Sequence, residues 1–212
     1  MRKILTAFVA LLASTAFAMA QAEPAAPTVF PNINIENFGQ MDEKLYRGAQ
    51  PTEDGYKALK ELGITTVIDL RKDNEAYSKT TVESLGMKYV NIPMTGWTTK
   101  DESVAEFLKV VNDPANGKVY LHCAAGKHRT GLAGAIYRLE NYGWDYDTSY
   151  KEMKNFGYFS GFFHRKIKGY VKDYFDKFGA EKQAAYKAAQ ASKLAAAGGT
   201  GGQVSLVTTT AN

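Results

Sequence analysis

Five residues between positions 122 and 130 have the types and spacing that a phosphate-binding thiolate loop requires: His122, Cys123, Gly126, Arg129 and Thr130. From ordinary residue frequencies, this combination arises by chance at a given position with a probability on the order of one in ten million. A thiol becomes a strong nucleophile when it is ionised, and its pKa falls at a helix N-terminus or beside cations. The segment therefore predicts nucleophilic catalysis by Cys123.

The residues that follow the cysteine are suited to binding an anion. A helix is predicted to begin at Arg129, so the backbone amides from Ala124 to Arg129 can point inward, and the helix dipole favours negative charge there. Gly126 allows the tight backbone turn that this arrangement needs. The predicted substrate-binding residues are Ala124, Ala125, Gly126, Lys127, His128 and Thr130.

Each remaining side chain of the loop has an expected task. Arg129 can offer two parallel N–H donors to phosphate oxygens, which a lysine could not match. The hydroxyl of Thr130 can donate to the sulfur, and His122 is expected to orient the loop through hydrogen bonds. These tasks predict two steps, in which the thiolate displaces an alcohol to form a cysteinyl-phosphate and water then hydrolyses this intermediate. No metal or other cofactor is expected.

Strands and helices alternate upstream of the loop. Apolar runs predict strands at residues 44–48, 64–70, 87–93 and 118–122, with helices at 52–62, 74–85 and 101–111 between them. The last third is predicted to be helical at residues 129–142, 146–155 and about 159–178. The alternation predicts an α/β fold with a mostly parallel sheet flanked by helices, in which ligands bind beyond the carboxyl ends of the strands. Cys123 follows directly after such an end.

The pattern His122-Cys123-x-x-Gly126-x-x-Arg129-Thr130 resembles the signature of the protein tyrosine and dual-specificity phosphatase superfamily. Two upstream segments, residues 45–51 and 67–71, resemble those of bacterial, plant and fungal atypical dual-specificity phosphatases. The resemblance covers about residues 37–142 and implies a phosphatase. Lys127 and His128 are similar to the variable positions of members that act on inositol pyrophosphates. Polyanionic substrates are therefore implied beside phosphotyrosine.

The resemblance also implies a general acid, an aspartate about thirty residues before the cysteine. Asp101 is the only aspartate in the segment 95–102 and is the predicted acid, with a helix cap or first-turn acid as the alternative. Asp69 is the reserve candidate, although its place inside a strand favours a structural role. Arg47 and Arg71 lie at predicted strand ends, and we expect surface or structural roles for both.

The N-terminus is typical of a secretory signal peptide. Residues 1–20 combine early positive charge, an apolar run and small residues, with cleavage expected after Ala20 and Ala22 as second choice. An uncleaved membrane anchor is the alternative, but the run is shorter than the roughly 20 residues that span a bilayer. We therefore expect a periplasmic or secreted bacterial protein.

The remaining chain is expected to form one domain. The predicted divisions are a lead-in at 21–36, a phosphatase domain at 37–178, a possible C-terminal helix at 179–194 and a disordered tail at 195–212. Cys123 is the only cysteine among 212 residues, so no intramolecular disulfide can form.

Composition narrows the expected partners. The formal net charge is +4, and the Lys and Arg residues are scattered along the sequence. This distribution does not indicate the clustered basic surface that binds nucleic acid. We expect a phosphorylated protein or a small polyanionic phosphate as the substrate, and no membrane partner after signal cleavage. A rhodanese-like sulfurtransferase and a non-catalytic phosphate-binding module are the alternative functions. His164 is expected to be solvated or packed and not to bind a metal.

Overall fold

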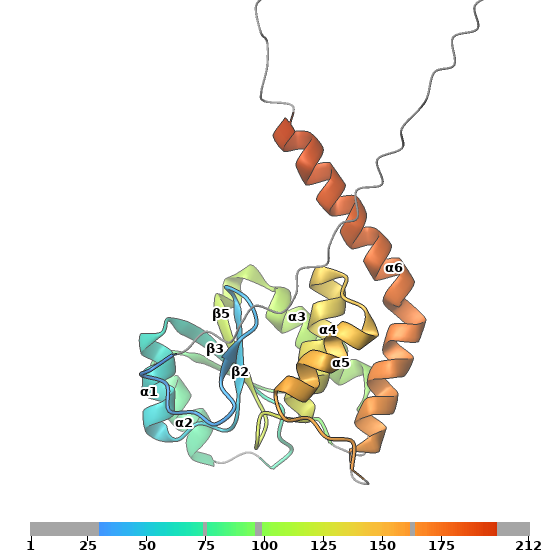
Figure 1. Ribbon diagram of the computed structural model, residues 1–212. Coiled ribbons are helices and arrows are strands. Elements are labelled where there is room, and N and C mark those ends of the chain that lie inside the picture. Colours follow the sequence, from blue (N-terminus) through green and yellow to red (C-terminus); the bar gives the residue numbers. More distant parts are fainter. Residues whose placement is uncertain (1–29, 74–75, 96–98, 162–163, 199–212) are drawn as a thin grey trace, which may run out of the picture.

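The computed structural model describes residues 30–73, 76–95, 99–161 and 164–198. In these residues a five-stranded sheet has the order β1-β2-β5-β3-β4 (Figure 1). The strands are β1 (Gly39–Gln40), β2 (Leu45–Gly48), β3 (Ile64–Asp69), β4 (Lys88–Asn91) and β5 (Lys118–His122). Strands β2, β5, β3 and β4 pair in parallel, and β1 pairs antiparallel with β2. The predicted α/β class with a mostly parallel sheet is confirmed.

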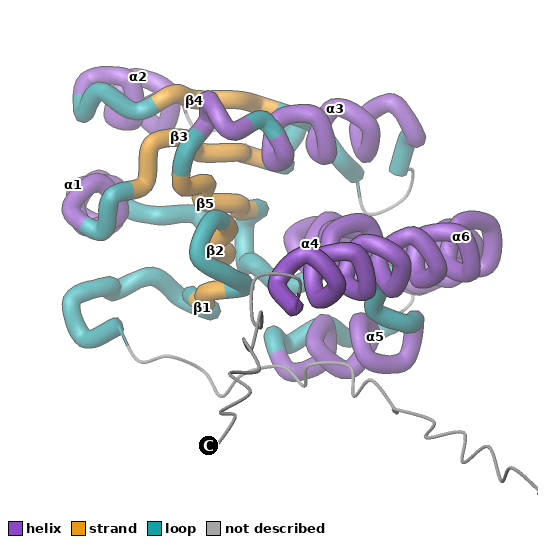
Figure 2. Tube along the Cα trace, turned by 90° about the horizontal axis from the view of Figure 1, so that it is seen from above, coloured by secondary structure: helices purple, strands orange, loops and turns teal. Residues whose placement is uncertain are grey.

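Helices cover both faces of the sheet (Figure 2). They are α1 (Glu53–Glu61), α2 (Ala76–Ser84), α3 (Asp101–Asn112), α4 (Arg129–Tyr142), α5 (Tyr146–Asn155) and α6 (Arg165–Gly198), with a short 3-10 helix at Pro114–Asn116. Helices α1 and α2 lie on one face, whereas α3, α4, α5 and α6 lie on the other. The hydrophobic core is accordingly divided into two clusters, one on each side of the strands.

Short polar side chains and a glycine fix the helix ends. The hydroxyl of Thr52 accepts a hydrogen bond from the amide of Gly55 at 3.2 Å, which caps α1 where the sequence predicts its start. Asp145 caps α5 in the same way through the amide of Thr148. Helix α4 ends at Gly143, whose φ of 59° is in the left-handed region.

The parallel strands bring their carboxyl ends to one edge of the sheet. In the strand registers Gly48 and Asp69 both pair with His122, and Asp69 also pairs with Asn91. The residue after His122 is Cys123, so the thiol lies where the ends of all four parallel strands meet. The fold therefore positions the predicted loop at the edge where α/β sheets bind ligands.

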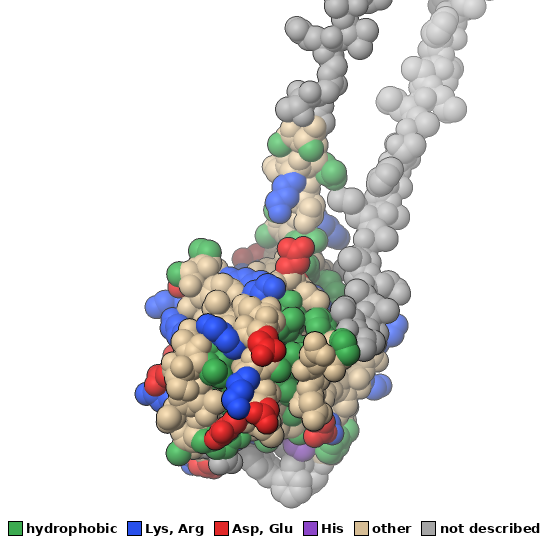
Figure 3. All heavy atoms as spheres, turned by 90° about the vertical axis from the view of Figure 1, so that its left-hand side faces the viewer, with side chains coloured by type: hydrophobic (Ala, Val, Ile, Leu, Met, Phe, Trp, Pro, Cys, Tyr) green, Lys and Arg blue, Asp and Glu red, His purple; other side chains and the backbone are tan. Residues whose placement is uncertain are grey.

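Helix α6 differs from the expected helix at both ends. It begins at Arg165 instead of about Phe159, and it continues to Gly198, through the first four residues of the predicted tail. Tyr186 packs over Gly143, and Lys182 forms an ion pair with Glu140 at 2.8 Å, so the helix is held against α4 to about residue 186. Beyond that point it extends past the body of the domain (Figures 1 and 3). Residues 199–212 lie outside the described residues.

The surface shown in Figure 3 has no patch of a single charge. Lys and Arg side chains are interspersed with Asp and Glu over this face of the domain. No helix in the described part of the chain is long and apolar enough to cross a membrane. The predicted signal peptide, residues 1–20, lies outside the described residues.

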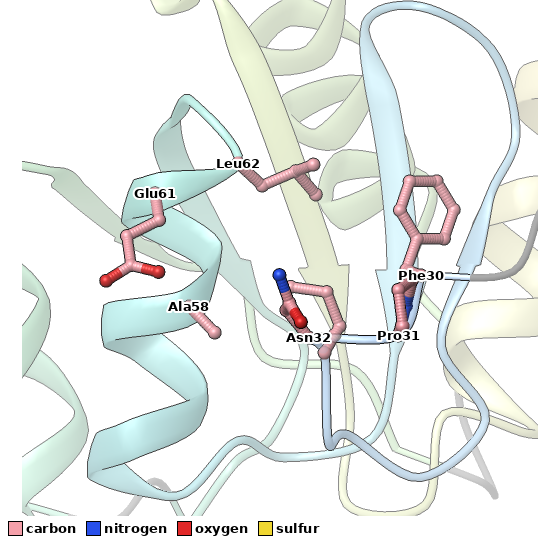
Figure 4. Close-up of a pocket in the computed structure, with 7 residues that line it drawn as sticks. Phe30, Pro31, Asn32, Ala58, Glu61 and Leu62 are labelled. Atoms are coloured by element: carbon pink, nitrogen blue, oxygen red, sulfur yellow. The ribbon is translucent and has the colours of Figure 1, made fainter.

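Residues 30–36, placed in the predicted lead-in, are part of the folded domain. The ring of Phe30 lies 5.1 Å from that of Phe38, and Ile35 is only 8% exposed. The segment also borders a pocket whose other wall is α1 and its C-terminal turn (Figure 4). The pocket is lined by Phe30, Pro31, Asn32, Ile33, Ala58, Glu61 and Leu62. None of these residues belongs to the thiolate loop, so this pocket is separate from the predicted site.

Candidate active site

The loop that contains the cysteine connects the end of β5 to the start of α4. Cys123 is 3% exposed, and helix α4 begins at Arg129. The amide of Gln50, just after β2, donates to the carbonyl oxygen of Ala124 at 2.9 Å and attaches the loop to the neighbouring strand. The predicted loop residues therefore lie together at the carboxyl edge of the sheet.

The surroundings of Cys123 favour its ionised form. Burial by itself raises the pKa of the thiol, because it penalises the charged form. The hydroxyl and amide of Thr130, the charge of Arg129 and the amide of Gly126 act in the opposite direction and together lower the pKa below its ordinary value. A lowered pKa increases the fraction of thiolate, which is the nucleophilic form of cysteine.

Gly126 has the conformation that the sequence predicts. Its φ is +67°, in the left-handed region. A β-carbon at this position would lie 2.4 Å from the carbonyl carbon of Gly48 and 2.5 Å from its oxygen. The loop therefore packs directly against the backbone at the end of β2, and no larger residue fits there.

Arg129 is held beside the loop by backbone carbonyl groups. Its Nη1 donates to the carbonyl oxygens of Leu70 and Met94 at 3.4 and 3.5 Å, in the loops that follow β3 and β4. The residue is partly exposed, so its other donors remain available to a phosphate at the loop.

His122 lies fully buried beneath the loop. Its Nδ1 is 3.3 Å from the carbonyl oxygen of Cys123, and its ring stacks on Tyr120 with centroids 5.8 Å apart. Burial lowers the pKa of His122 to about 4, so the ring is neutral at pH 7. A neutral ring with its proton on Nδ1 orients the loop backbone, which agrees with the supporting role expected for it.

Lys127 and His128, two of the predicted substrate-binding residues, both have partners in the protein. The Nζ of Lys127 forms an ion pair with Glu36 at 3.3 Å. The ring of His128 stacks on that of His164, with centroids 3.4 Å apart. A substrate must therefore compete with Glu36 for Lys127, whereas the packing of His128 makes it part of the wall of the site.

The two candidate acids have different surroundings. Asp101 is exposed in the first turn of α3 and accepts a hydrogen bond from the hydroxyl of Tyr170 at 2.7 Å, while the helix cap itself is Lys100. Asp69 is fully buried and forms a forked pair with Arg71. Burial by itself raises the pKa of Asp69. The hydrogen bonds from Arg71, together with other neighbouring groups, outweigh this effect and lower the pKa below its ordinary value, so Asp69 stays ionised. Asp69 is structural, and Asp101 remains the predicted acid.

Two residues near the loop were not predicted to be part of the site. Arg47 is fully buried, so of the surface or structural role expected for it only the structural one fits, and its Nη2 donates to the carbonyl oxygen of Gly126 at 2.7 Å. The side-chain amide of Asn37 donates to the same oxygen at 3.0 Å. The only signal in the sequence was the resemblance of residues 45–51 to a family segment, which does not show where Arg47 points.

The described residues include no group of three or more His, Cys, Asp or Glu side chains that could hold a metal ion. His164 packs on His128 and lies in no such group.

Comparison with known proteins identifies the family. A family model described as "DSP-PTPase phosphatase fused to NAD+ Kinase" matches residues 29–160. The dual specificity protein phosphatase TpbA of Pseudomonas aeruginosa is 30% identical over 145 residues, which are 65% of this chain and 64% of that protein. The inositol diphosphatase SIW14 of Saccharomyces cerevisiae is 27% identical over 136 residues, 59% of this chain and 47% of that protein. The matches thus span less than two thirds of these curated relatives.

Solved structures have the same fold. The crystal structure of P. aeruginosa TpbA matches with a TM-score of 0.62 at 25% identity, covering 79% of this chain and 99% of that one. The core catalytic domain of SIW14 matches with a TM-score of 0.56 at 24% identity, covering 68% and 94%. Since the family model covers more than half of the chain, this protein belongs to the DSP-PTPase phosphatase family and groups with the atypical dual-specificity phosphatases.

Proposed function

We propose that this chain is a cysteine-dependent phosphatase that hydrolyses phosphate monoesters through a phosphate ester on Cys123. The position of Cys123 carries the proposal: its thiol lies in a tight loop at the N-terminus of α4, next to Arg129. The lowered pKa of the thiol supports it, because it favours the ionised form within this loop. The hydrogen-bond donors of this loop can stabilise the charge that spreads over the phosphate oxygens during transfer. Membership in the phosphatase family supports this activity over sulfur transfer.

The reaction has two displacements at phosphorus. In the first, the thiolate of Cys123 forms a P–S bond while the P–O bond to the alcohol breaks, and the departing oxygen takes a proton from Asp101. In the second, water attacks phosphorus and returns a proton to Asp101, while the P–S bond breaks and the thiolate is restored. Arg129 holds the phosphate oxygens in both steps, and the hydroxyl of Thr130 stabilises the sulfur as it leaves.

The substrate belongs to one of two classes. A TpbA structure contains pTyr, and several relatives of this chain are inositol diphosphatases. We infer a phosphorylated protein or an inositol polyphosphate as the substrate. Lys127 is the residue that distinguishes these classes, because its charge could bind a second phosphate only after it leaves Glu36.

We also propose that the protein is exported. The basic start, apolar run and small residues of positions 1–20 support cleavage of a signal peptide after Ala20. N-terminal sequencing of protein recovered from the periplasmic fraction should then begin at Gln21, or at Glu23 for the second cleavage site. Recovery of the full-length chain from the membrane fraction would contradict cleavage.

The activity is tested by phosphate release from purified mature protein with EDTA and reductant present. An aryl phosphate, a phosphotyrosine peptide and inositol polyphosphates are compared, and the substrate with the highest kcat/KM identifies the class. Release from none of them by folded protein would favour the binding-module alternative.

A further inference from the structure

Two side chains from outside the loop hold its outer backbone. The side-chain amide of Asn37 donates to the carbonyl oxygens of Ala125 and Gly126 at 3.4 and 3.0 Å, and to that of Phe156 at 2.9 Å. Arg47 donates to the oxygen of Gly126 at 2.7 Å. Because these donors hold the loop carbonyl groups on the outside, the loop amides are free to point toward an anion inside.

The conformation of Asn37 is itself unusual. Its φ is +57°, and it is the only non-glycine residue with a positive φ in the described ranges. Asparagine adopts this region more readily than most residues, and the conformation persists when the surrounding structure fixes it. The three hydrogen bonds of its side chain supply that fixation.

Arg47 is a buried cation that lacks a carboxylate within hydrogen-bond distance in the described part of the chain. Its guanidinium lies 4.1 Å from the centroid of the Phe156 ring, and its Nε has no hydrogen-bond partner. Gly134 of α4 lies beside the guanidinium, since a β-carbon there would lie 3.4 Å from Nη1. The nearby carboxylate of Glu152 is already paired with Arg138 at 2.6 Å.

A buried charge without a paired anion is unfavourable, so negative charge near Arg47 would stabilise it. Burial lowers the pKa of Arg47 to about 10, which leaves it protonated at neutral pH. The charges of Glu152 and Cys123 have the opposite effect and favour its protonated form. The effect of Glu152 is the larger of the two and that of Cys123 the smaller.

We propose that Asn37 and Arg47 form a brace, which holds the loop in its anion-binding conformation before a ligand arrives, and that the charge of Arg47 stabilises negative charge inside the loop. Arg129 contacts the bound phosphate from the open side, whereas Arg47 acts from behind through the carbonyl of Gly126. Both brace residues are positioning residues, since neither touches the substrate. The inference deepens the proposed function and rests on the same loop.

The test measures the ionisation of Cys123 and its ligand without turnover. Because Cys123 is the only cysteine, the ultraviolet absorbance of the thiolate, taken as the difference from a matched Cys123→Ser protein, reports its pKa alone. Binding of inorganic phosphate is measured by calorimetry. The variants are Arg47→Met, Arg47→Lys and Asn37→Gly, the last of which keeps a residue suited to positive φ.

Asn116→Ala is the matched control. Asn116 is a buried asparagine whose amide donates to the carbonyl of Val110 at 2.8 Å, next to the start of β5 and therefore at the opposite end of that strand from the loop. It should lower stability as the brace variants do, but it should change neither the thiol pKa nor phosphate affinity.

The brace predicts that Arg47→Met raises the thiol pKa by about one unit and weakens phosphate binding about tenfold. Arg47→Lys should fall between Arg47→Met and wild type, and Asn37→Gly should weaken phosphate binding several-fold. The brace would be overturned if the folded variants had the wild-type thiol pKa and the wild-type phosphate affinity. It would also be overturned if Asn116→Ala changed both quantities as much as the brace variants do. If Arg47→Met does not fold, Arg47→Lys and Asn37→Gly decide by the same criteria.

A failed phosphatase assay and a failed brace can be told apart. Neither the absorbance measurement nor phosphate binding requires turnover. The brace variants would therefore still change the thiol pKa and the phosphate affinity in a protein without phosphatase activity. Conversely, an unchanged thiol pKa in Arg47→Met would leave the phosphatase proposal standing on Cys123 and Arg129.

Discussion

The imidazole rings of His128 and His164 stack with centroids 3.4 Å apart and planes 8° apart. His128 belongs to the thiolate loop, and His164 lies in the turn just before α6. Phe159 meets both rings edge-on at 4.6 and 5.1 Å. The last helix is thereby attached to the active-site loop through a pair of titratable rings.

This pair makes stability depend on pH. Burial lowers the pKa of His128 to about 4, assisted by His164, and burial also lowers the pKa of His164. Between about pH 6.5 and pH 4 the folded state therefore binds fewer protons than the unfolded state. The contribution of the pair to the free energy of unfolding is complete above about pH 6.5 and is lost as the pH falls toward 4. His122 contributes in the same window.

We predict that His164→Phe, which keeps an aromatic ring on His128, loses less stability than wild type between pH 7 and pH 5. Denaturant unfolding at the two pH values measures the difference. An equal loss in both proteins would show that the pair does not carry the pH dependence.

Glu36 forms an ion pair with Lys127. The variant Glu36→Gln frees Lys127, so we expect KM for an inositol polyphosphate to fall roughly two- to fivefold, since an exposed ion pair contributes little. KM for an aryl monophosphate should hardly change. Glu43→Gln, an exposed acid without this contact, controls for net charge. The same fall in KM with Glu43→Gln would attribute the effect to general charge instead.

Gly126 has no room for a side chain. Gly126→Ala adds a β-carbon against the backbone of Gly48 at a positive φ, and we expect a loss of about 1–3 kcal/mol in the free energy of unfolding. Phosphate release should fall about 100-fold or more, because the loop amides move. Gly169→Ala is the control, because nothing lies within 4 Å of its added carbon. Near-normal activity in Gly126→Ala would mean that the loop tolerates another conformation.

Asp101 is tested by the dependence of rate on the leaving group. If it protonates the departing oxygen, Asp101→Asn should lower kcat about 100-fold for an alkyl phosphate but much less for an activated aryl phosphate. Tyr170→Phe removes its hydrogen-bond partner and should retain most activity. Equal losses on both substrates with Asp101→Asn would show that the residue has a structural role in the first turn of α3 and is not the general acid.

The sequence predicted most elements because their signals are local. Thr52 caps α1, and the run before Cys123 is β5, because capping hydrogen bonds and apolar patterns depend on neighbouring residues. The predicted helix start near Phe159 was wrong for a tertiary reason. His164, directly before Arg165, lies in a turn and stacks on His128, and no periodicity reveals this contact.

The residues of the thiolate loop could be predicted from the sequence, but the residues that hold the loop in place could not. Cys123, Gly126 and Arg129 follow from spacing within nine residues. The burial of Arg47 and its bond to Gly126 join positions 79 residues apart, so they depend on the pairing of β2 with β5. The ion pair of Lys127 with Glu36 likewise depends on the packing of residues 30–36, a segment expected to lie outside the domain.

The most direct test of the central claim is to trap the phosphate on the enzyme. Wild-type protein and Cys123→Ala are each mixed with an aryl phosphate in the presence of EDTA, and the reactions are quenched with acid. After digestion, mass spectrometry measures the mass of the peptide that contains position 123. We predict one added phosphoryl group on Cys123 in the wild type, with neither the adduct nor phosphate release in Cys123→Ala. Metal-independent phosphate release by Cys123→Ala at the wild-type rate would contradict a thiolate mechanism.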